Sequence, residues 1–360
     1  MKPTISDVAR LTNKNRSTVS RVLRNDKRYT ISEACRKQIM EAAAKLNYVP
    51  QHSARSLATG KSYCVGALLG TPEKDLASPV ASRMFLQMAH TLLRSGYHFT
   101  FLPMMPGRSA RQHILDVLQQ GRVDGLYVGT RMIQPDMLED VAKHRIPMVT
   151  TDAFAEVRDS GLLTVVDRDH RPGMKQMAEA LVRHGHRRVL YVISQSQVDN
   201  DRCFAHRVER FQEAAEQAGI REVDVFIYTE EIRGFFADRA EARLAVEREI
   251  DRFASYSAVV ANSDLVAYGV MDALRAAGIE PGKDIAVTGG DNLETGPNYP
   301  VKEPFLATIE TNMPLRGQRV AETLLERMQK PDTPVRTVRV PTTFIARPSL
   351  TSAKGAAALR

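Results

Sequence analysis

Tryptophan is absent from the 360 residues, and cysteine occurs only three times, at Cys35, Cys64 and Cys203. Three widely spaced thiols argue against a disulfide framework and against a zinc site, and they favour a reducing compartment. No run of about 18 apolar residues offers a membrane-spanning helix. The N-terminal MKPTISDVAR carries charge but no apolar core, so it does not read as a secretory signal. We therefore expect a cytoplasmic protein with no membrane partner.

The signatures of common enzyme families are also missing. The chain has no phosphate-binding G-x-x-x-x-G-K, no dinucleotide-binding G-x-G-x-x-G, no H-E-x-x-H and no G-x-S-x-G. His184 and His186 enter a predicted strand two residues apart. We expect a surface role for this pair and not a shared metal ion. The sequence therefore predicts no catalytic residue, no metal site and no cofactor.

Positive charge is concentrated in the first sixth of the chain. Residues 1–62 hold 13 lysines and arginines against 4 acidic residues, whereas residues 63–360 hold 37 against 38. A basic segment on an almost neutral remainder is typical of a protein that binds a polyanion, because each neutralised phosphate releases a condensed counterion. The alternative is a solvated basic tail, which would lack periodically spaced apolar residues. This segment has such residues, so we expect it to fold.

Three short helices are predicted within this basic segment. Thr4 and Asp7 form a T-x-x-D capping box ahead of an apolar stripe, which predicts a helix over residues 5–12. Asn13 can take the left-handed conformation that ends this helix, and a second helix is expected over 16–23. A third helix is predicted to begin after a serine at position 32 and to end near position 47.

The second helix has one apolar face and one polar, basic face. Val19, Val22 and Leu23 share the inner face. The outward side chains are Arg16, Ser17, Ser20 and Arg21. Three short helices with a basic face on the middle one describe a helix-turn-helix module, a DNA-binding unit.

The first unit of the sequence resembles the DNA-binding head of the lac repressor (LacI/GalR) family of bacterial transcription regulators. The resemblance rests on the segments TISDVARL, STVSRVLRN and SARSLATGKS, which follow one another in this order. The resemblance continues along nearly the whole chain. The matching segments are VDGLYVG at 123–129, IPMV at 146–149, GHRRVLYV at 185–192, NSDLVAYGVMDAL at 262–274 and AVTGGDN at 286–292. Each segment is weak evidence alone, but the ordered set is specific.

The resemblance implies a role for each polar residue of the head. The second helix would lie in the major groove, where Arg16 and Arg21 would read guanine and Ser17 would be an adaptable third contact. Phosphate contacts are expected from Thr4, Asn15, Thr18 and Ser20. For the last two residues the alternative is simple exposure on the helix. The turn departs from the family, which has glycine and a small apolar residue where Asn13 and Lys14 stand.

Residues 53–59 match the hinge helix of that family, within a linker expected over 51–62. Leu57 would insert between base steps in the minor groove and bend the duplex, while Ser53 and Ala54 stay small so that two hinge helices can approach. The alternative is that the leucine fills a gap in an interdomain linker.

The remaining sequence predicts an α/β fold. Short apolar runs alternate with helical segments, which indicates parallel sheets covered on both faces. The runs are CVGALL at 64–69, FTFLP at 99–103, GLYV at 125–128, PMVT at 147–150, VLYVI at 189–193, VFIY at 225–228, AVVA at 258–261 and IAVT at 285–288. The resemblance implies two Rossmann-like lobes in a periplasmic-binding-protein-like body.

The expected domain boundaries follow from this arrangement. A helix-turn-helix domain would occupy residues 1–50, and the two-lobed effector-binding and dimerisation domain residues 63–350. The first lobe would comprise about 63–164 plus 306–329 and the second about 165–293 plus 336–350, with a frayed tail at 351–360. The chain would cross between lobes near Thr164, 293–306 and 329–336.

Ligands of such sheets bind beyond the carboxyl ends of the strands. Six side chains there suit a polyhydroxylated effector and match positions that the family uses: Ser78, Asp169, Arg207, Ser263, Asp264 and Asp291. Asp264 is equally expected as a helix-start residue and Ser78 as a turn residue. Arg168, Arg171, Arg207 and Arg210 near the cleft leave an anionic sugar derivative open, against the alternative that they are solvated.

Two functions are consistent with these features. The first is an effector-controlled transcription regulator, a repressor by resemblance, which acts at the nucleoid as a homodimer on a pseudo-palindromic operator in double-stranded DNA. The second is a two-lobed small-molecule binding module without operator-specific DNA binding. The basic head and the missing signal peptide favour the first.

Overall fold

The computed structural model describes residues 3–24, 29–49, 56–57, 59–70, 76–104, 107–129, 132–144, 146–199, 202–229, 237–296 and 301–353. The chain forms two compact units, Met1–Tyr63 and Cys64–Arg360. In the described part, no helix is both long and apolar enough to cross a membrane.

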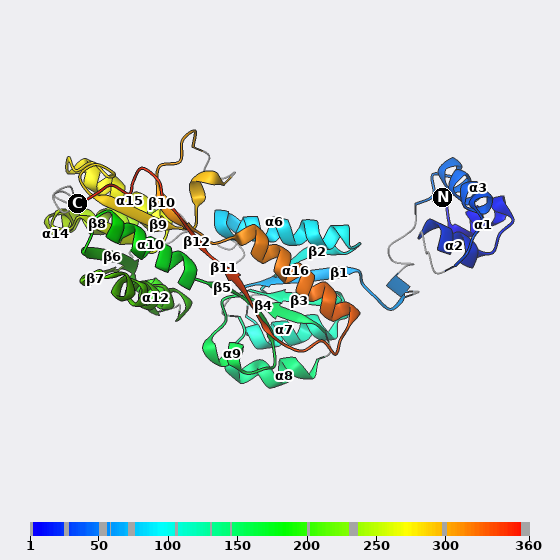
Figure 1. The fold of residues 1–360 in the computed structure, drawn as a ribbon. Coiled ribbons are helices and arrows are strands. Elements are labelled where there is room, and N and C mark those ends of the chain that lie inside the picture. Colours follow the sequence, from blue (N-terminus) through cyan, green and yellow to red (C-terminus); the bar gives the residue numbers. More distant parts are fainter. Residues whose placement is uncertain are drawn as a thin grey trace. The chain divides into compact units, whose positions relative to one another are not determined.

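The first unit is built from three short helices, shown in blue in Figure 1. They are α1 (Ile5–Thr12), α2 (Arg16–Leu23) and α3 (Glu33–Lys45), which confirms the helices predicted from the sequence. The backbone N–H of Thr4 donates to the Asp7 carboxylate (2.9 Å), and Asn13 ends α1 with a left-handed φ of 49°. These local signals set the helix bounds because they satisfy backbone groups that a helix end leaves unpaired.

A small apolar core holds the three helices together. Val8, Val19 and Ile39 are fully buried where the helices meet. Burial of each such side chain contributes about 1.5 to 3 kcal/mol. The inner face of α2 is therefore committed to packing, and its opposite face is left to solvent.

The second unit contains two six-stranded sheets. The first has the strand order β11-β5-β4-β3-β1-β2 and the second β12-β10-β9-β8-β6-β7. Every strand that the sequence predicts is confirmed: β1 (Cys64–Leu69), β2 (His98–Pro103), β3 (Gly125–Val128), β4 (Met148–Thr150), β6 (Arg188–Ser194), β7 (Glu222–Tyr228), β8 (Ala258–Ala261) and β9 (Ala286–Gly290). Four strands are not predicted: β5 (Thr164–Asp169), β10 (Ala307–Glu310), β11 (Thr337–Pro341) and β12 (Thr343–Ile345).

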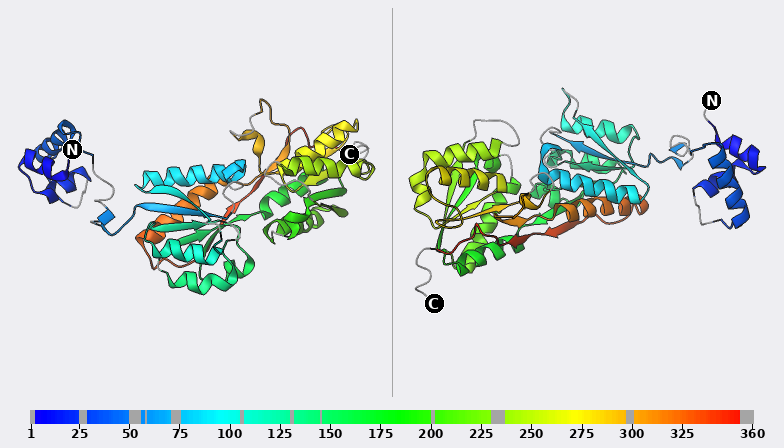
Figure 2. Two further views of the ribbon diagram at one scale, coloured as in Figure 1. Left: turned by 180° about the vertical axis from the view of Figure 1, so that it is seen from behind. Right: turned by 90° about the horizontal axis from the view of Figure 1, so that it is seen from above.

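Helices cover both faces of the first sheet (Figures 1 and 2). On one face lie α6 (Pro79–Arg94) and α16 (Met313–Gln329), packed against each other. Gly317 of α16 faces the backbone of Met84 so closely that no side chain would fit. On the other face lie α7 (Ala110–Gln119), α8 (Leu138–Lys143) and α9 (Ala155–Asp159).

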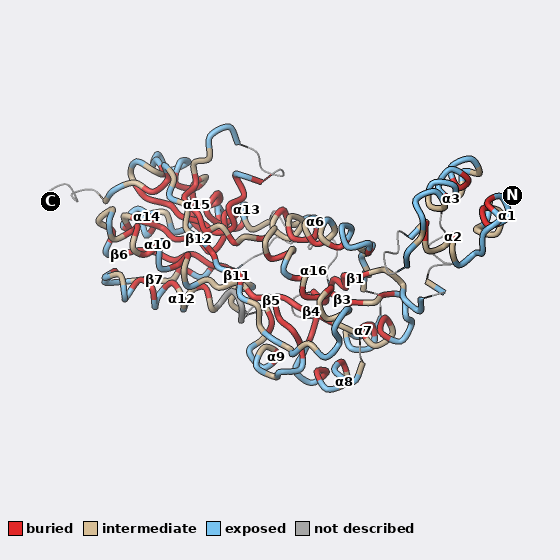
Figure 3. The backbone as a smooth tube through the Cα atoms, turned by 45° about the vertical axis from the view of Figure 1, so that its right-hand side comes forward, coloured by how far each residue is buried: buried red, intermediate tan, exposed pale blue. Residues whose placement is uncertain are grey.

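The second sheet has the same layered arrangement. In β6, Val189 and Tyr191 pack toward α10 (Arg171–Arg183) and α12 (Arg202–Ala218). Leu190 and Val192 point to the opposite face, where α13 (Ala237–Arg248), α14 (Ile250–Ala254) and α15 (Asp264–Ala276) lie. A strand that is buried on both faces has a continuous apolar sequence, which is why short apolar runs predicted these strands. Figure 3 shows the buried strands in red.

The lobe boundaries expected from the sequence need correction. Strand β5 pairs with β4 and β11 in the first sheet, so the second lobe begins after Asp169 and not at 165. Strand β10 pairs with β9 in the second sheet, so the first of the two chain segments that form the second lobe ends at Glu310 and not at 293. The chain crosses between sheets at 169–171, 310–313 and 341–343. Sheet membership depends on pairing between distant segments, which local periodicity does not specify.

One smaller expectation is wrong, and another is tested only in part. Of the tail expected to fray, residues 351–353 are described, and the N–H of Ala353 donates to the carbonyl oxygen of His184 (2.8 Å). His186 is not a surface residue, since it is fully buried with its ring nitrogens near Ser257 Oγ (2.9 Å) and the Thr351 carbonyl oxygen (2.8 Å). The C-terminal segment supplies that second contact, which explains why the histidine can be buried. Residues 354–360 lie outside the described residues.

Candidate functional sites

The outer face of α2 presents the side chains expected to contact bases. Arg16 and Ser17 are exposed, and Arg21 is half-buried. The Arg21 guanidinium lies 3.7 Å from the centre of the Tyr29 ring. The first half of the helix thus offers an arginine and a hydroxyl to solvent, and the second half offers an arginine held against an aromatic ring.

The residues expected to contact phosphates differ in what they already bond. Asn15 occupies the N-cap position of α2, but its side chain makes no capping bond. The Thr4 hydroxyl donates to the Asp7 carboxylate (2.7 Å), so a phosphate would compete with an existing bond. Thr18 and Ser20 are half-buried on α2.

Only part of the expected hinge segment is described. Ser53 and Ala54 lie outside the described residues. Ser56 and Leu57 are helical, and the N–H of Gly60 donates to the Ser56 carbonyl oxygen (2.8 Å). Leu57 is 88% exposed. A leucine this exposed fills no gap within its own unit, so the gap-filling alternative has no support in these residues.

Four of the six residues expected at the effector site line one hollow of about 190 Å³ in the second unit, which we call the first hollow: Ser78, Arg207, Ser263 and Asp291. Ser78 and Ser263 begin α6 and α15, where their hydroxyls accept from the N–H groups of Ala81 (3.2 Å) and Val266 (3.3 Å). Each hydroxyl keeps its own hydrogen for a ligand. The helix starts therefore point two donors into the hollow.

Arg207 and Asp291 form the charged pair of this hollow. The Arg207 guanidinium is almost fully buried, donates to the Asn262 carbonyl oxygen (2.8 Å) and lies 3.7 Å from the Asp291 carboxylate. Burial, and next the charge of Arg168, lower the pKa of Arg207. Burial raises the pKa of Asp291, against the influence of Arg207. Both groups are poorly solvated, which strengthens any hydrogen bond that they make to a ligand.

Asp152 lies in the same hollow and was not expected there. Its carboxylate accepts two bonds from Arg168 (both 3.1 Å) and an ion pair from Arg316 (2.7 Å). Arg316 also donates to the Val166 carbonyl oxygen (3.1 Å). Burial alone would raise the pKa of Asp152, but the two guanidinium groups hold it well below its ordinary value. This network joins the end of β4 to β5 and α16.

Asp264 does not line the hollow, contrary to the effector-contact expectation. It is fully buried at the start of α15, where it accepts from Thr308 Oγ1 (2.5 Å) and from the Leu293 N–H (2.7 Å). Burial, and next the charge of Asp291, raise its pKa to about 7. The structure gives this carboxyl a role in joining α15 to the segments after β9 and at β10, because both oxygens already have partners.

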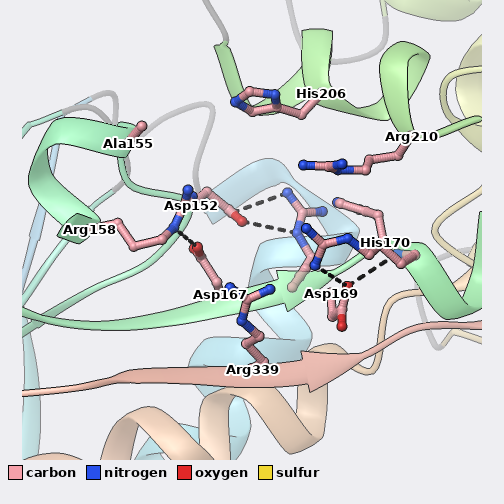
Figure 4. A pocket seen from close by; sticks show the side chains of 11 residues that line it. Asp152, Ala155, Arg158, Asp167, Asp169, His170, His206, Arg210 and Arg339 are labelled. Carbon is pink, nitrogen blue, oxygen red and sulfur yellow. Dashed lines mark hydrogen bonds and ion pairs between the residues drawn. The ribbon is translucent and has the colours of Figure 1, made fainter. Parts of the chain in front are cut away.

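Asp169 lines a separate, neighbouring hollow of about 280 Å³ (Figure 4). This second hollow shares Asp152 and Arg168 with the first. Asp169 accepts from the N–H of Arg171 (3.2 Å), and its own carbonyl oxygen accepts from the N–H of Thr342 (3.1 Å). The structure thus separates Asp169 from the four residues that it brings together.

The strand-end rule that found Ser263 and Asp291 could also have found Asp152, which lies two residues after the end of β4. The sequence named Arg168 only as one of the arginines near the cleft. The residues of the first hollow that the sequence did not indicate as effector contacts are Val80, Ala81, Asp152, Gln197, Asp238, Leu265, Leu293, Met313 and Arg316. Arg316 has no local signal, since it lies inside a long amphipathic helix far along the chain.

Comparison with protein families identifies two regions. Residues 4–51 match the family described as bacterial regulatory proteins, lacI family. Residues 178–350 match a periplasmic binding protein-like domain. The first region contains the three helices of the first unit, and the second contains most of the second lobe.

Known proteins are similar over nearly the full length. The HTH-type transcriptional repressor PurR of Glaesserella parasuis serovar 5 (strain SH0165) is 27% identical over 328 residues, 91% of this chain and 90% of that protein. The lac repressor dimer bound to operator and the anti-inducer ONPF matches 98% of this chain and 100% of that chain, with a TM-score of 0.75 and 20% identity. A complex of the transcriptional regulator CelR with cellobiose matches 96% of this chain and 99% of that chain, with a TM-score of 0.62 and 23% identity. These two structures establish a shared fold.

Proposed function

This chain belongs to the lacI family of bacterial regulatory proteins, and on that premise we propose that it is a sequence-specific operator-binding repressor controlled by a small-molecule effector. The observation that carries the proposal is the outer face of α2, where Arg16 and Ser17 stand exposed on a helix whose other face is buried. A helix of this kind fits the major groove and offers forked donors to guanine.

The net charge of the head supports the same function. The excess of basic residues in 1–62 has no counterpart in the rest of the chain. Lysines and arginines that neutralise phosphates make binding fall steeply as salt rises. Asn15, Thr18 and Ser20 are proposed to fix the helix on the backbone, and Thr4 to join them by exchanging its bond to Asp7 for one to phosphate.

We propose that the effector occupies the first hollow, between the two lobes. Arg207 and Asp291 offer a donor fork and an acceptor in one poorly solvated place, and two serine hydroxyls add to the polar lining. This set suits a ligand with several hydroxyl groups, such as a sugar or sugar derivative. A ligand that contacts both lobes stabilises the arrangement in which they lie closer together.

Selection of bound duplexes from a random library, at near-physiological salt, tests the DNA-binding proposal. We expect enrichment of a pseudo-palindromic site, because the protein is proposed to bind as a homodimer with one head on each half-site. Recovery of random sequence would contradict operator binding. It would leave the second function, a two-lobed small-molecule binding module.

A thermal-shift screen against sugars, sugar acids, nucleobases and sugar phosphates tests the effector proposal. A ligand that binds only the folded state raises the unfolding temperature by mass action. The same screen on Arg207→Ala and Asp291→Ala should lose the shift of any compound that binds the first hollow. Retention of the shift in both variants would place the ligand elsewhere.

A further inference from the structure

The second hollow, defined above by Asp169 and shown in Figure 4, contains more basic than acidic side chains. Its charged lining comprises five arginines and three aspartates: Arg158, Arg168, Arg171, Arg210, Arg339, Asp152, Asp167 and Asp169. The arginines of the lining therefore exceed the aspartates by two. A concave surface focuses such a field because its walls have a low dielectric constant.

The aspartates of this hollow do not offset the excess. Asp152 is held by both Arg168 and Arg316, and the latter adds a further positive charge behind the lining. Asp167 pairs with Arg158 (2.5 Å). Burial, and next the charge of Asp152, raise the pKa of Asp167, so this carboxyl group ionises less readily than an exposed one.

Arg339 and Arg210 approach the hollow from different lobes. Arg339 lies on β11 beside Asp167 of β5 in the parallel register, and its side chain points toward Asp167 and Asp169 in Figure 4. Within the described ranges it has no hydrogen-bond or ion-pair partner. Arg210 lies on α12, where its ion-pair partner is Glu213 on the same helix (2.7 Å).

His170 lines the same hollow and adds no positive charge to it. Its Nδ1 atom is buried without a hydrogen-bond partner among the residues that the structure describes. Burial, and next the charges of Arg207 and Arg168, lower its pKa well below the ordinary value, so the ring is neutral at pH 7.

We propose that the second hollow binds the oxyanion of a small ligand, a phosphate or carboxylate group, between Arg339 of the first lobe and Arg210 of the second. Each guanidinium can present two parallel N–H donors to such a group. An anion that bonds to both lobes would favour their closed arrangement. Its identification as part of the effector, or as a co-effector beside the first hollow, rests on the proposed function, whereas anion binding itself does not.

Thermal unfolding of the full-length chain at pH 7 tests the proposal, with inorganic phosphate as the first probe and malonate as the second. Each probe is compared with sodium chloride at the same ionic strength. At 20 mM of the preferred anion we expect the unfolding temperature of the wild type to rise by about 2 °C, the size that millimolar affinity predicts. The anion that gives the larger shift identifies the oxyanion as phosphate or carboxylate.

Three variants decide whether the shift belongs to this hollow. Arg210→Gln and Arg339→Gln should each lose at least half of the shift, while unfolding near the wild-type temperature in chloride because both side chains are exposed or half-exposed. Arg243→Gln is the matched control, since Arg243 also pairs along its own helix, with Glu247 (2.7 Å), and does not line the hollow. It should keep the full shift.

The same shift in all four proteins, or no shift with either anion, would overturn the proposal. The operator selection described above separates the two hypotheses. If the shift depends on Arg210 and Arg339 but no operator is selected, the anion site stands and the regulator function falls. If an operator is selected but no arginine-dependent shift occurs, the regulator function stands and the anion site falls.

Discussion

The guanidinium of Arg21 stacks on the ring of Tyr29, 3.7 Å from its centre. One residue belongs to α2 and the other lies beyond it, so the contact links the proposed base-reading helix to the segment that leads to α3. A cation-π contact at an exposed place contributes about 0.5 to 1 kcal/mol. It also restricts the rotamers of a long side chain, which lowers the entropy lost when that side chain meets a base.

Arg21→Ala is expected to remove discrimination at one base pair in each half-site, at about 1 to 3 kcal/mol per contact. Competition binding against operators changed one base pair at a time measures this. Lys37→Ala is the control, because Lys37 is an exposed side chain of α3 with a weak ion pair. A uniform loss across all operator sequences would instead place Arg21 on a phosphate.

Tyr29→Leu should weaken the same discrimination by a smaller amount, within about 1 kcal/mol, because it removes the stacking partner and keeps the arginine. The same competition assay applies. Unchanged discrimination in this variant, with a loss in Arg21→Ala, would show that the stack does not position the guanidinium.

Leu57→Ala is expected to reduce the bending of operator DNA and to weaken operator binding. The physical reason is that a side chain inserted between base steps unstacks them and kinks the duplex. Fluorescence energy transfer between the ends of a labelled operator measures the bend, and a thermal shift with an identified effector checks that effector affinity is unchanged. An unaltered bend would return Leu57 to a linker role.

Asp152→Asn is expected to destabilise the second unit by about 3 kcal/mol or more, because it leaves two buried guanidinium groups without their shared carboxylate. Denaturant unfolding measures the loss. The matched control is Asp272→Asn, whose ion pair with Arg239 is more exposed and should cost about 1 kcal/mol or less. Equal losses in the two variants would contradict the importance assigned to the Asp152 network.

Asp264→Asn is expected to change how stability depends on pH. The pKa of Asp264 is raised to about 7 in the folded protein, above its unfolded value of about 3.9. Between these values the folded state holds a proton that the unfolded chain has released, so the free energy of unfolding falls as pH rises. Asparagine does not titrate, so it makes no such pH-dependent contribution. Between pH 5 and pH 8 the free energy of unfolding of the variant should therefore rise by about 2 to 3 kcal/mol relative to that of the wild type.

Urea unfolding of both proteins across that pH range is the measurement. A difference between the variant and the wild type that stays constant with pH would show that Asp264 is ionised throughout. Comparing the two proteins at each pH cancels the contributions of the carboxyl groups that both retain far from position 264. Asp291 is coupled to Asp264, so its contribution forms part of the measured difference.

Local chemistry made the head predictable. Both ends of α1 and the start of α3 follow from Thr4, Asn13 and Ser32, because each residue satisfies or ends a helix within a few positions of itself. The eight predicted strands follow from short apolar runs for the same reason. Four of the residues expected at the effector site also lie together, since they follow the carboxyl ends of parallel strands in the two sheets, and the first hollow lies between these ends.

Contacts between distant segments determined the features that the sequence did not predict. Strand β11 joins the first sheet by pairing with β5, about 170 residues earlier in the chain. The buried Asp264 is bonded by Thr308 of β10, 44 residues further along. Arg316 reaches Asp152 from a helix that has no sequence signal for that contact. The residues alone therefore determined the helices, the strands and the polar strand ends. Sheet membership, the buried charge network and the separation of Asp169 from the first hollow required the folded chain, because these depend on which surfaces remain once the sheets have packed.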